Sequence, residues 1–199
     1  MNFLAHLHLS GDDPKIMVGN FIGDFVKGKN LPGRYESGIT FGIGLHRSID
    51  EFTDRHPIVK ASKQRLWEKY RHYSGVIVDM FYDHFLSSNW DAFHSRPLIE
   101  YSVSAYSILL AHQAILPERI ARILPYMVKG NWLVGYGTID GIGQALSGMA
   151  QRTPFKSKME EATKDLNDHY PLFKQEFMQF FPELKSFSDG VIRSYQPGN

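Results

Sequence analysis

The chain has 199 residues, a length that fits one domain, so residues 1–199 are predicted to form a single folded unit. Its 22 basic and 21 acidic residues leave a formal net charge of +1, too weak a global field to favour nucleic acid or membranes as partners. The lack of cysteine excludes disulfides, thiolate metal sites and cysteine nucleophiles. No apolar stretch approaches the ~18 residues that span a bilayer, and residues 1–13 lack the basic leader of a signal peptide. We therefore expect a cytoplasmic protein.

Proline and glycine divide the chain into segments of helical length, which predicts an all-α fold. No Asn-Gly or Asp-Gly turn lies between runs of alternating apolar residues, as a β-hairpin would require. A first helix is predicted to begin at Pro14, behind the caps Asp12 and Asp13, and to end before Gly28. A second helix is predicted over 35–56, because the proline that follows disfavours a helical residue before it. Further helices are predicted over 59–73, 76–93, 97–114, 117–129, 139–150, 157–180 and 183–194.

The predicted helix over 76–93 is apolar almost all round, as expected of a central helix, yet it carries three ionisable residues. Asp79 and Asp83 are four residues apart and should share one face, with His84 offset by about 100° from Asp83. Removing such groups from water is costly unless they are paired, hydrogen-bonded or bound to metal. Two interpretations stay open: a buried polar network with Arg or Tyr partners, or part of a metal site.

A second row of ionisable residues, formed by His46, Asp50 and Asp54, lies along one face of the second predicted helix. Asp24 lies on the first helix, among apolar neighbours. If these helices pack side by side, their histidine and carboxylate groups surround one cavity and suit Mn²⁺, Mg²⁺, Fe²⁺ or Zn²⁺. The alternative is a surface pair of His46 and Asp50, worth only ~0.3 to 0.5 kcal/mol, with Asp24 capping or pairing with Lys27.

Two other segments resemble functional motifs without matching them. The run D-L-N-D-H at 165–169 has polar neighbours and a proline after it, which favours a solvated helix end. The glycine-rich segment 135–143 fits neither a dinucleotide fingerprint nor a phosphate-binding loop, which favours a tight bend or close packing.

Four ordered motifs carry a resemblance to a known family: N-F-L-A-H-L-H-L at 2–9, G-N-F-I-G-D-F-V-K-G at 19–28, G-I-G-L-H-R-S-I-D-E-F-T-D-R-H-P at 42–57, and V-D-M-F-Y-D-H-F-L at 78–86. With them the chain resembles, over nearly its full length, the acyl carrier protein phosphodiesterases, or ACP hydrolases. This bacterial family is placed with the HD-type metal phosphohydrolases, so the resemblance implies an HD-like helical bundle. The usual HD order does not read straight through this sequence, whose contiguous pair is Asp83 and His84.

The resemblance also implies an activity. The family hydrolyses the phosphodiester that joins 4′-phosphopantetheine to a serine of holo-acyl carrier protein, with a divalent metal that is commonly Mn²⁺, and releases apo carrier protein and 4′-phosphopantetheine. Mg²⁺ or Fe²⁺ are the alternative metals. The family motifs carry over onto His6, Asn20, Asp24, His46, Arg47, Asp50, Asp79, Asp83 and His84.

We predict roles for these residues on that basis. The expected metal ligands are Asp24, His46, Asp79, Asp83 and His84. Asp50 is expected to orient a ligand or the water, and His6 to be either the general acid that protonates the serine or a core histidine. The expected phosphate contacts are Arg47, Lys27 and Asn20.

The implied substrate is an acidic helical protein, so a basic docking surface is expected near the site. One candidate consists of Lys60, Lys63, Arg65, Lys69 and Arg71, although a solvated helix face is an equal interpretation, and another of Lys27, Lys29 and Arg34. Two rival functions stay open: an HD-like phosphohydrolase acting on a small nucleotide or sugar phosphate, and a non-catalytic helical module that uses the same residues structurally.

Overall fold

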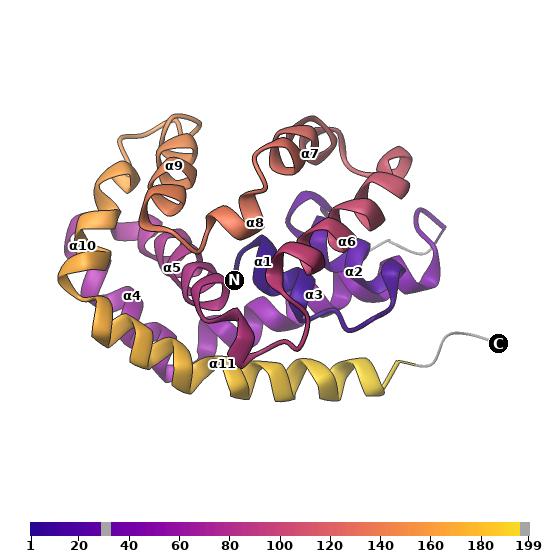
Figure 1. Cartoon of the computed structure of the whole chain (residues 1–199), viewed down its shortest axis with the longest axis horizontal. Helices are drawn as coiled ribbons and strands as arrows, with labels where there is room; N and C mark the ends of the chain where they lie inside the picture. The colour runs from indigo at the N-terminus through magenta and orange to yellow at the C-terminus, as the bar shows by residue number, and fades with distance from the viewer. Residues whose placement is uncertain (29–32, 196–199) are drawn as a thin grey trace.

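The computed structural model describes residues 1–28 and 33–195, which form α-helices and short 3₁₀ turns without a β-strand (Figure 1). The all-α prediction is therefore confirmed. One continuous cluster of buried apolar side chains joins the elements, and no described helix has the length and apolarity needed to cross a membrane. The α-helices are α1 (Phe3–His8), α2 (Pro14–Ile22), α3 (Ser37–Arg55), α4 (Pro57–Tyr70), α5 (Ser74–Ser88), α6 (Leu98–Ala111), α7 (Glu118–Lys129), α8 (Trp132–Gly135), α9 (Ile139–Ala150), α10 (Ala162–Asp168) and α11 (Tyr170–Arg193).

Helices α2 and α3 begin close to their predicted starts and pack against each other at very short range. Asp13 caps α2, because its Oδ1 accepts hydrogen bonds from the backbone nitrogens of Lys15 at 2.8 Å and Ile16 at 3.2 Å. A side chain on Gly42 of α3 would overlap the backbone of α2, so this approach requires glycine. One face of α3 therefore lies directly against α2, and Asp24 follows the end of α2 in a 3₁₀ turn.

Helix α5 is the central helix that the sequence predicts. The side chains of Ile77, Phe81 and Phe85 are completely buried. Helices α1, α4, α9 and α11 all pack against it, and Figure 1 shows it inside the molecule. An ionisable residue on α5 therefore meets protein groups rather than solvent on most sides, which is why its neighbours decide its role.

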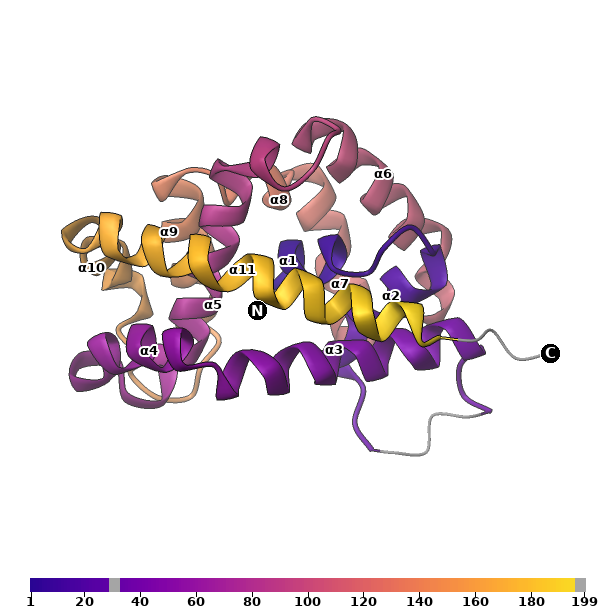
Figure 2. The same cartoon turned by 90° about the horizontal axis from the view of Figure 1, so that it is seen from below.

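The C-terminal region differs from its prediction. A break was expected between 157–180 and 183–194, but the break falls at His169, and α11 continues through Pro182 along the length of the molecule (Figure 2). Proline removes one helical hydrogen bond and disfavours this conformation. The burial of Phe177, Phe181 and Leu184 on both sides of Pro182 outweighs that cost and holds α11 in one piece.

The short helix α1 was not predicted. A helix of six residues is unstable in isolation, because nucleation is costly relative to the few hydrogen bonds gained. Asp83 of α5 stabilises it from outside: Oδ2 accepts a hydrogen bond from the backbone nitrogen of Leu4 at 2.8 Å, and Oδ1 accepts one from Ala5 at 3.2 Å. A carboxylate at this end also favours the helix dipole. This contact fixes α1, and with it His6, in the interior.

Candidate metal centre

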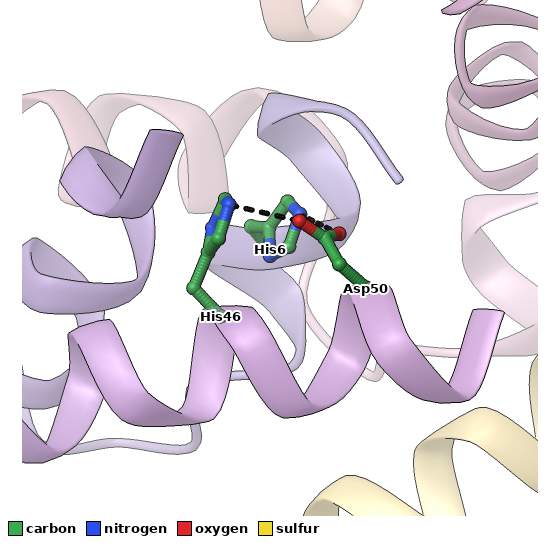
Figure 3. Close-up of side chains that lie close together, drawn as sticks. All are labelled: His6, His46 and Asp50. Carbon is green, nitrogen blue, oxygen red and sulfur yellow. Dashed lines mark ion pairs between the residues drawn. The ribbon is translucent and has the colours of Figure 1, made fainter. Parts of the chain in front are cut away.

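His6, His46 and Asp50 converge from two helices, as Figure 3 shows. His46 and Asp50 lie one turn apart on α3, and His6 lies on α1. Asp50 contacts both rings: its Oδ2 lies 3.1 Å from Nε2 of His46, and its Oδ1 lies 3.3 Å from Nε2 of His6. One ligand atom from each residue lies within 4.8 Å of the others, close enough to hold one metal ion. The predicted facing pair of His46 and Asp50 is therefore confirmed.

Asp24 adds a carboxylate to this group from the turn after α2. Its Oδ1 lies 3.2 Å from Nε2 of His46, so that ring nitrogen lies between two carboxylates. A side chain on Gly23 would overlap the imidazole of His46, and the glycine therefore allows the turn to approach the ring. Both histidines are buried, whereas the side chain of Asp24 is 66% exposed. Asp24 is thus the most exposed member of the group, and the side chain of Asp50, 37% exposed, also reaches solvent.

Asn20, assigned to phosphate contact from the sequence, is placed beneath the two histidines and is completely buried. Its side-chain oxygen accepts a hydrogen bond from Nδ1 of His6 at 2.8 Å, and its backbone oxygen accepts one from Nδ1 of His46 at 2.8 Å. Its Nδ2 donates to the backbone oxygen of His6 and to Ser10. The bonds leave the Nε2 lone pair of each neutral ring facing Asp50, as a metal-binding histidine requires.

The local charges shift the pKa values of this group. Burial alone would lower the pKa of His46, but hydrogen bonds with Asp24 and Asp50 raise it to about 9. Burial lowers the pKa of His6, and the charge of His46 lowers it further. Burial opposes ionisation of Asp50, but the hydrogen bond from His46 and the nearby ring of His6 bring the pKa of Asp50 well below its ordinary value. A proton on His46 thus lies between ionised carboxylates, and a bound metal ion would displace it.

The residues present fit a divalent metal. Although Nε2 of His6 lies 3.3 Å from Asp50, it is buried and makes no hydrogen bond within the described chain. A buried polar atom without a partner is costly, and coordination to a cation would satisfy its lone pair. Imidazole nitrogens combined with carboxylate oxygens are suitable ligands for Mn²⁺, Fe²⁺ or Zn²⁺.

Asp79 of α5 lies at the edge of the same group. Its Oδ1 is 3.2 Å from the amino nitrogen of Met1, and that nitrogen is 3.6 Å from Oδ1 of Asp50. Burial disfavours the charged amine, but the carboxylates of Asp79 and Asp50 raise its pKa to about 10. A positive charge therefore lies between two carboxylates from different helices, which is consistent with a cation-binding region.

The other two predicted ligands on α5 are not brought to this group. Both oxygens of Asp83 accept backbone hydrogen bonds from α1. Both ring nitrogens of His84 also have partners: Nδ1 lies 2.8 Å from the backbone oxygen of Tyr136, and Nε2 lies 3.0 Å from the hydroxyl of Tyr170. The alternative of a buried polar network with tyrosine partners describes His84, so we place neither residue in the candidate metal site.

Arg47 and Lys27, the other two predicted phosphate contacts, have different surroundings in the structure. Arg47 donates hydrogen bonds to the backbone oxygens of Val26 at 3.1 Å and Gly28 at 2.9 Å, so it anchors the segment after Asp24. Lys27 is exposed and lies only three residues after Asp24. Of the two, Lys27 is the side chain available to a ligand.

The basic surface predicted on α4 is largely neutralised by acidic partners. Three of its five cations form ion pairs, from Lys63 to Asp54 at 2.6 Å, from Arg65 to Glu176 at 2.7 Å and from Lys69 to Asp165 at 2.9 Å. This finding favours a solvated and packed helix face over a docking surface. In the second predicted surface, Arg34 stacks over the ring of Tyr35, and Lys29 lies outside the described residues.

A cavity of about 530 Å³ begins at the exposed edge of the group. Asp24 and Asp79 line one end of it, together with Met1. Its walls are formed by α7 and α9, which lie on opposite sides of α8 in Figure 1. Its size falls within the ~300 to 1,000 Å³ range of small-molecule sites. Through Asp24, Met1 and Asp79, the candidate metal group therefore adjoins a space that can hold an organic ligand.

Comparison with known proteins identifies the family. The family model described as "Acyl carrier protein phosphodiesterase" matches residues 1–184. The chain belongs to the acyl carrier protein phosphodiesterase family. The acyl carrier protein phosphodiesterase of Photorhabdus laumondii subsp. laumondii is 35% identical over 189 residues, which cover 92% of this chain and 93% of the relative. That of Yersinia enterocolitica is 35% identical over 187 residues, covering 94% and 96%. That of Escherichia coli O6:H1 is 33% identical over 185 residues, covering 92% and 95%.

The resemblance given by the sequence motifs is thus confirmed at family level. No solved structure matches the chain, so the HD-like classification of this acyl carrier protein phosphodiesterase family member stays a prediction. Sequence reasoning assigned no role to the cavity walls, including Arg119 of α7 and Arg152 after α9. The two arginines lie on segments that only tertiary packing brings to one cavity.

Proposed function

We propose that this protein hydrolyses the phosphodiester between 4′-phosphopantetheine and the serine of holo-acyl carrier protein, giving apo carrier protein and 4′-phosphopantetheine. Full-length relatives that carry the name acyl carrier protein phosphodiesterase support the substrate. The observation that carries the chemistry is the convergence of His6, His46 and Asp50, beside Asp24 and Asp79, which line a cavity.

The reaction has two chemical obstacles. The negative charge of a phosphodiester repels an attacking hydroxide, and a serine alkoxide is a poor leaving group. A divalent metal, for which we propose Mn²⁺ with Mg²⁺ or Fe²⁺ as alternatives, would supply an activated water and positive charge against the phosphoryl oxygens.

We assign Nε2 of His6, Nε2 of His46 and the carboxylates of Asp24 and Asp50 to metal binding, with Asp79 as a further ligand from α5. The buried proton that His6 shares with Asn20 is on Nδ1, which leaves Nε2 without a proton to donate. This geometry supports a ligand role for His6 over the general-acid role. Asn20 would orient both rings.

The exposed ammonium of Lys27 would contact the phosphate from the solvent side. It follows Asp24 by three residues, in the segment that Arg47 anchors through backbone oxygens. This anchoring limits how far Lys27 can move from the phosphate position.

The experiment that tests the function is incubation of purified protein with holo-acyl carrier protein and Mn²⁺, followed by intact mass spectrometry. We expect loss of the whole 4′-phosphopantetheine group, and no loss in the presence of EDTA. The same preparation is tested with nucleotides and sugar phosphates. Unchanged holo carrier protein together with turnover of those small phosphates would overturn the proposal in favour of the rival phosphohydrolase function.

A further inference from the structure

The cavity beside the candidate metal group has two chemically distinct parts. One end carries the carboxylates of Asp24 and Asp79, which suit a cation. The rest is mainly apolar and includes Met80, Trp132 and Met149. A ligand that fills it must therefore place a group that interacts with the cation at one end and an uncharged chain along the remainder.

Two arginines line the cavity on opposite walls. Arg119 belongs to α7, and Arg152 follows the end of α9. Both side chains are exposed, and neither forms an ion pair with another described residue. In contrast, Lys63, Arg65 and Lys69 of α4 all form ion pairs. The guanidinium of Arg119 lies over the ring of Phe25, 5.8 Å from its centroid. Unpaired guanidinium groups in a partly apolar cavity favour an anionic ligand, and their planar donors match phosphate oxygens.

We infer that this cavity binds the phosphopantetheine group itself, with the pantetheine arm along the apolar wall between α7 and α9 and the phosphate between the metal end and the two arginines. The inference rests on the proposed function for the identity of the ligand. It assigns substrate selection to α7, α9 and Arg152, outside the residues that hold the metal.

Glycine at position 148 offers a direct way to test the arm site. Gly148 lines the cavity within α9, and a Cβ placed there would meet only Nη2 of Arg152, at 3.7 Å. A larger side chain therefore enters free space in the cavity without meeting the backbone. Replacing a helical glycine by alanine favours the helix by about 0.5 to 1 kcal/mol, and phenylalanine also forms helix more readily than glycine, so both variants are expected to fold.

The experiment compares Gly148→Ala and Gly148→Phe with the unmodified protein. Isothermal titration calorimetry measures 4′-phosphopantetheine binding in the presence of Mn²⁺, and kcat/KM is measured with holo carrier protein. We expect Gly148→Phe to weaken binding and reduce kcat/KM by about tenfold or more, and Gly148→Ala to have a smaller effect, because obstruction increases with side-chain size. Val103→Phe is the control: Val103 is 58% exposed on α6 and outside the cavity, so both quantities should be unchanged.

The phosphate position is tested with Arg152→Gln. The unmodified protein should bind 4′-phosphopantetheine more tightly than pantetheine, and the variant should reduce that preference by about tenfold, the effect of about 1.4 kcal/mol. If holo carrier protein is hydrolysed but Gly148→Phe binds and turns over like the unmodified protein, the cavity assignment is overturned and the proposed function stands. If holo carrier protein is inert while 4′-phosphopantetheine binding is lost only in Gly148→Phe, the function fails and the cavity assignment stands.

Discussion

The side-chain oxygen of Asn20 lies 2.8 Å from Nδ1 of His6. The backbone oxygen of the same residue lies 2.8 Å from Nδ1 of His46. One residue of α2 thus fixes the orientation and the tautomer of two rings that belong to two other helices. Because both Nε2 atoms then face Asp50, the arrangement is set before any metal binds.

Replacing Asn20 by alanine should therefore weaken metal binding without removing a ligand. Loss of such an orienting hydrogen bond typically costs about 10- to 100-fold in metal affinity, and we expect that range for Asn20→Ala in a calorimetric titration with Mn²⁺. Asn89→Ala is the control, because Asn89 follows the last residue of α5 and, within the described chain, its side chain bonds only to Phe85 and Ser88. Unchanged Mn²⁺ affinity in Asn20→Ala would contradict the orienting role.

Asp50 and Asp54 provide a matched pair on one face of α3. Asp50 contacts both site histidines, whereas Asp54 is 68% exposed and pairs with Lys63. Asp50→Asn should abolish high-affinity Mn²⁺ binding and lower kcat on holo carrier protein by about 100-fold or more, a loss of about 2.7 kcal/mol of transition-state stabilisation. Asp54→Asn should retain both, since an exposed pair contributes at most about 1 kcal/mol to stability. Equal metal content in the two variants would show that Asp50 does not take part in metal binding.

His84 tests whether α5 contributes structure or metal ligands. Its ring bonds to the backbone oxygen of Tyr136 and the hydroxyl of Tyr170, so His84→Ala leaves both without this partner. We expect the free energy of unfolding to fall by about 1 to 3 kcal/mol, measured by urea denaturation, with the bound Mn²⁺ stoichiometry unchanged. Elemental analysis measures the Mn²⁺ content of folded His84→Ala. Loss of the bound metal in this variant would show that His84 is a metal ligand.

The contrast between α3 and α5 explains how far the sequence predicts the site. The pair of His46 and Asp50 depends only on helical spacing, which the sequence specifies directly. The roles of Asp83 and His84 depend on which segments pack against α5. Asp83 meets α1, whose six residues give no recognisable helical signal, and His84 meets residues 52 and 86 positions further along the chain. Spacing shows that such groups need partners, but only the tertiary fold identifies them.

The run D-L-N-D-H at 165–169 also contains an aspartate whose partners only the tertiary fold identifies. Asp168 is exposed and pairs with Lys164, as expected of a solvated helix end. Asp165 instead accepts hydrogen bonds from Lys69 at 2.9 Å and from the hydroxyl of Tyr70 at 2.5 Å. It therefore joins α10 to α4, and it explains why Lys69 is not available as part of a docking surface.

This contact predicts a pH dependence of stability. Burial opposes ionisation of Asp165, but the hydrogen bonds from Tyr70 and Lys69 outweigh it and lower its pKa below the ordinary value of 3.8. A carboxyl group whose pKa is lower in the folded state stabilises the fold above its unfolded pKa and loses that contribution as the pH falls through its folded pKa. Asp165→Asn should thus lower the free energy of unfolding near neutral pH by about 1 to 2 kcal/mol.

The difference between Asp165→Asn and the unmodified protein should then narrow as the pH falls below 3.8, because the unmodified carboxylate becomes protonated as well. Urea denaturation at neutral pH and in steps below that value measures this difference. Asp168→Asn is the control. Because the ion pair of Asp168 with Lys164 is exposed, this substitution should change the free energy of unfolding by no more than about 0.5 kcal/mol at every pH. A difference for Asp165→Asn that is constant across the pH range would show that packing, not the ionised carboxylate, joins α10 to α4.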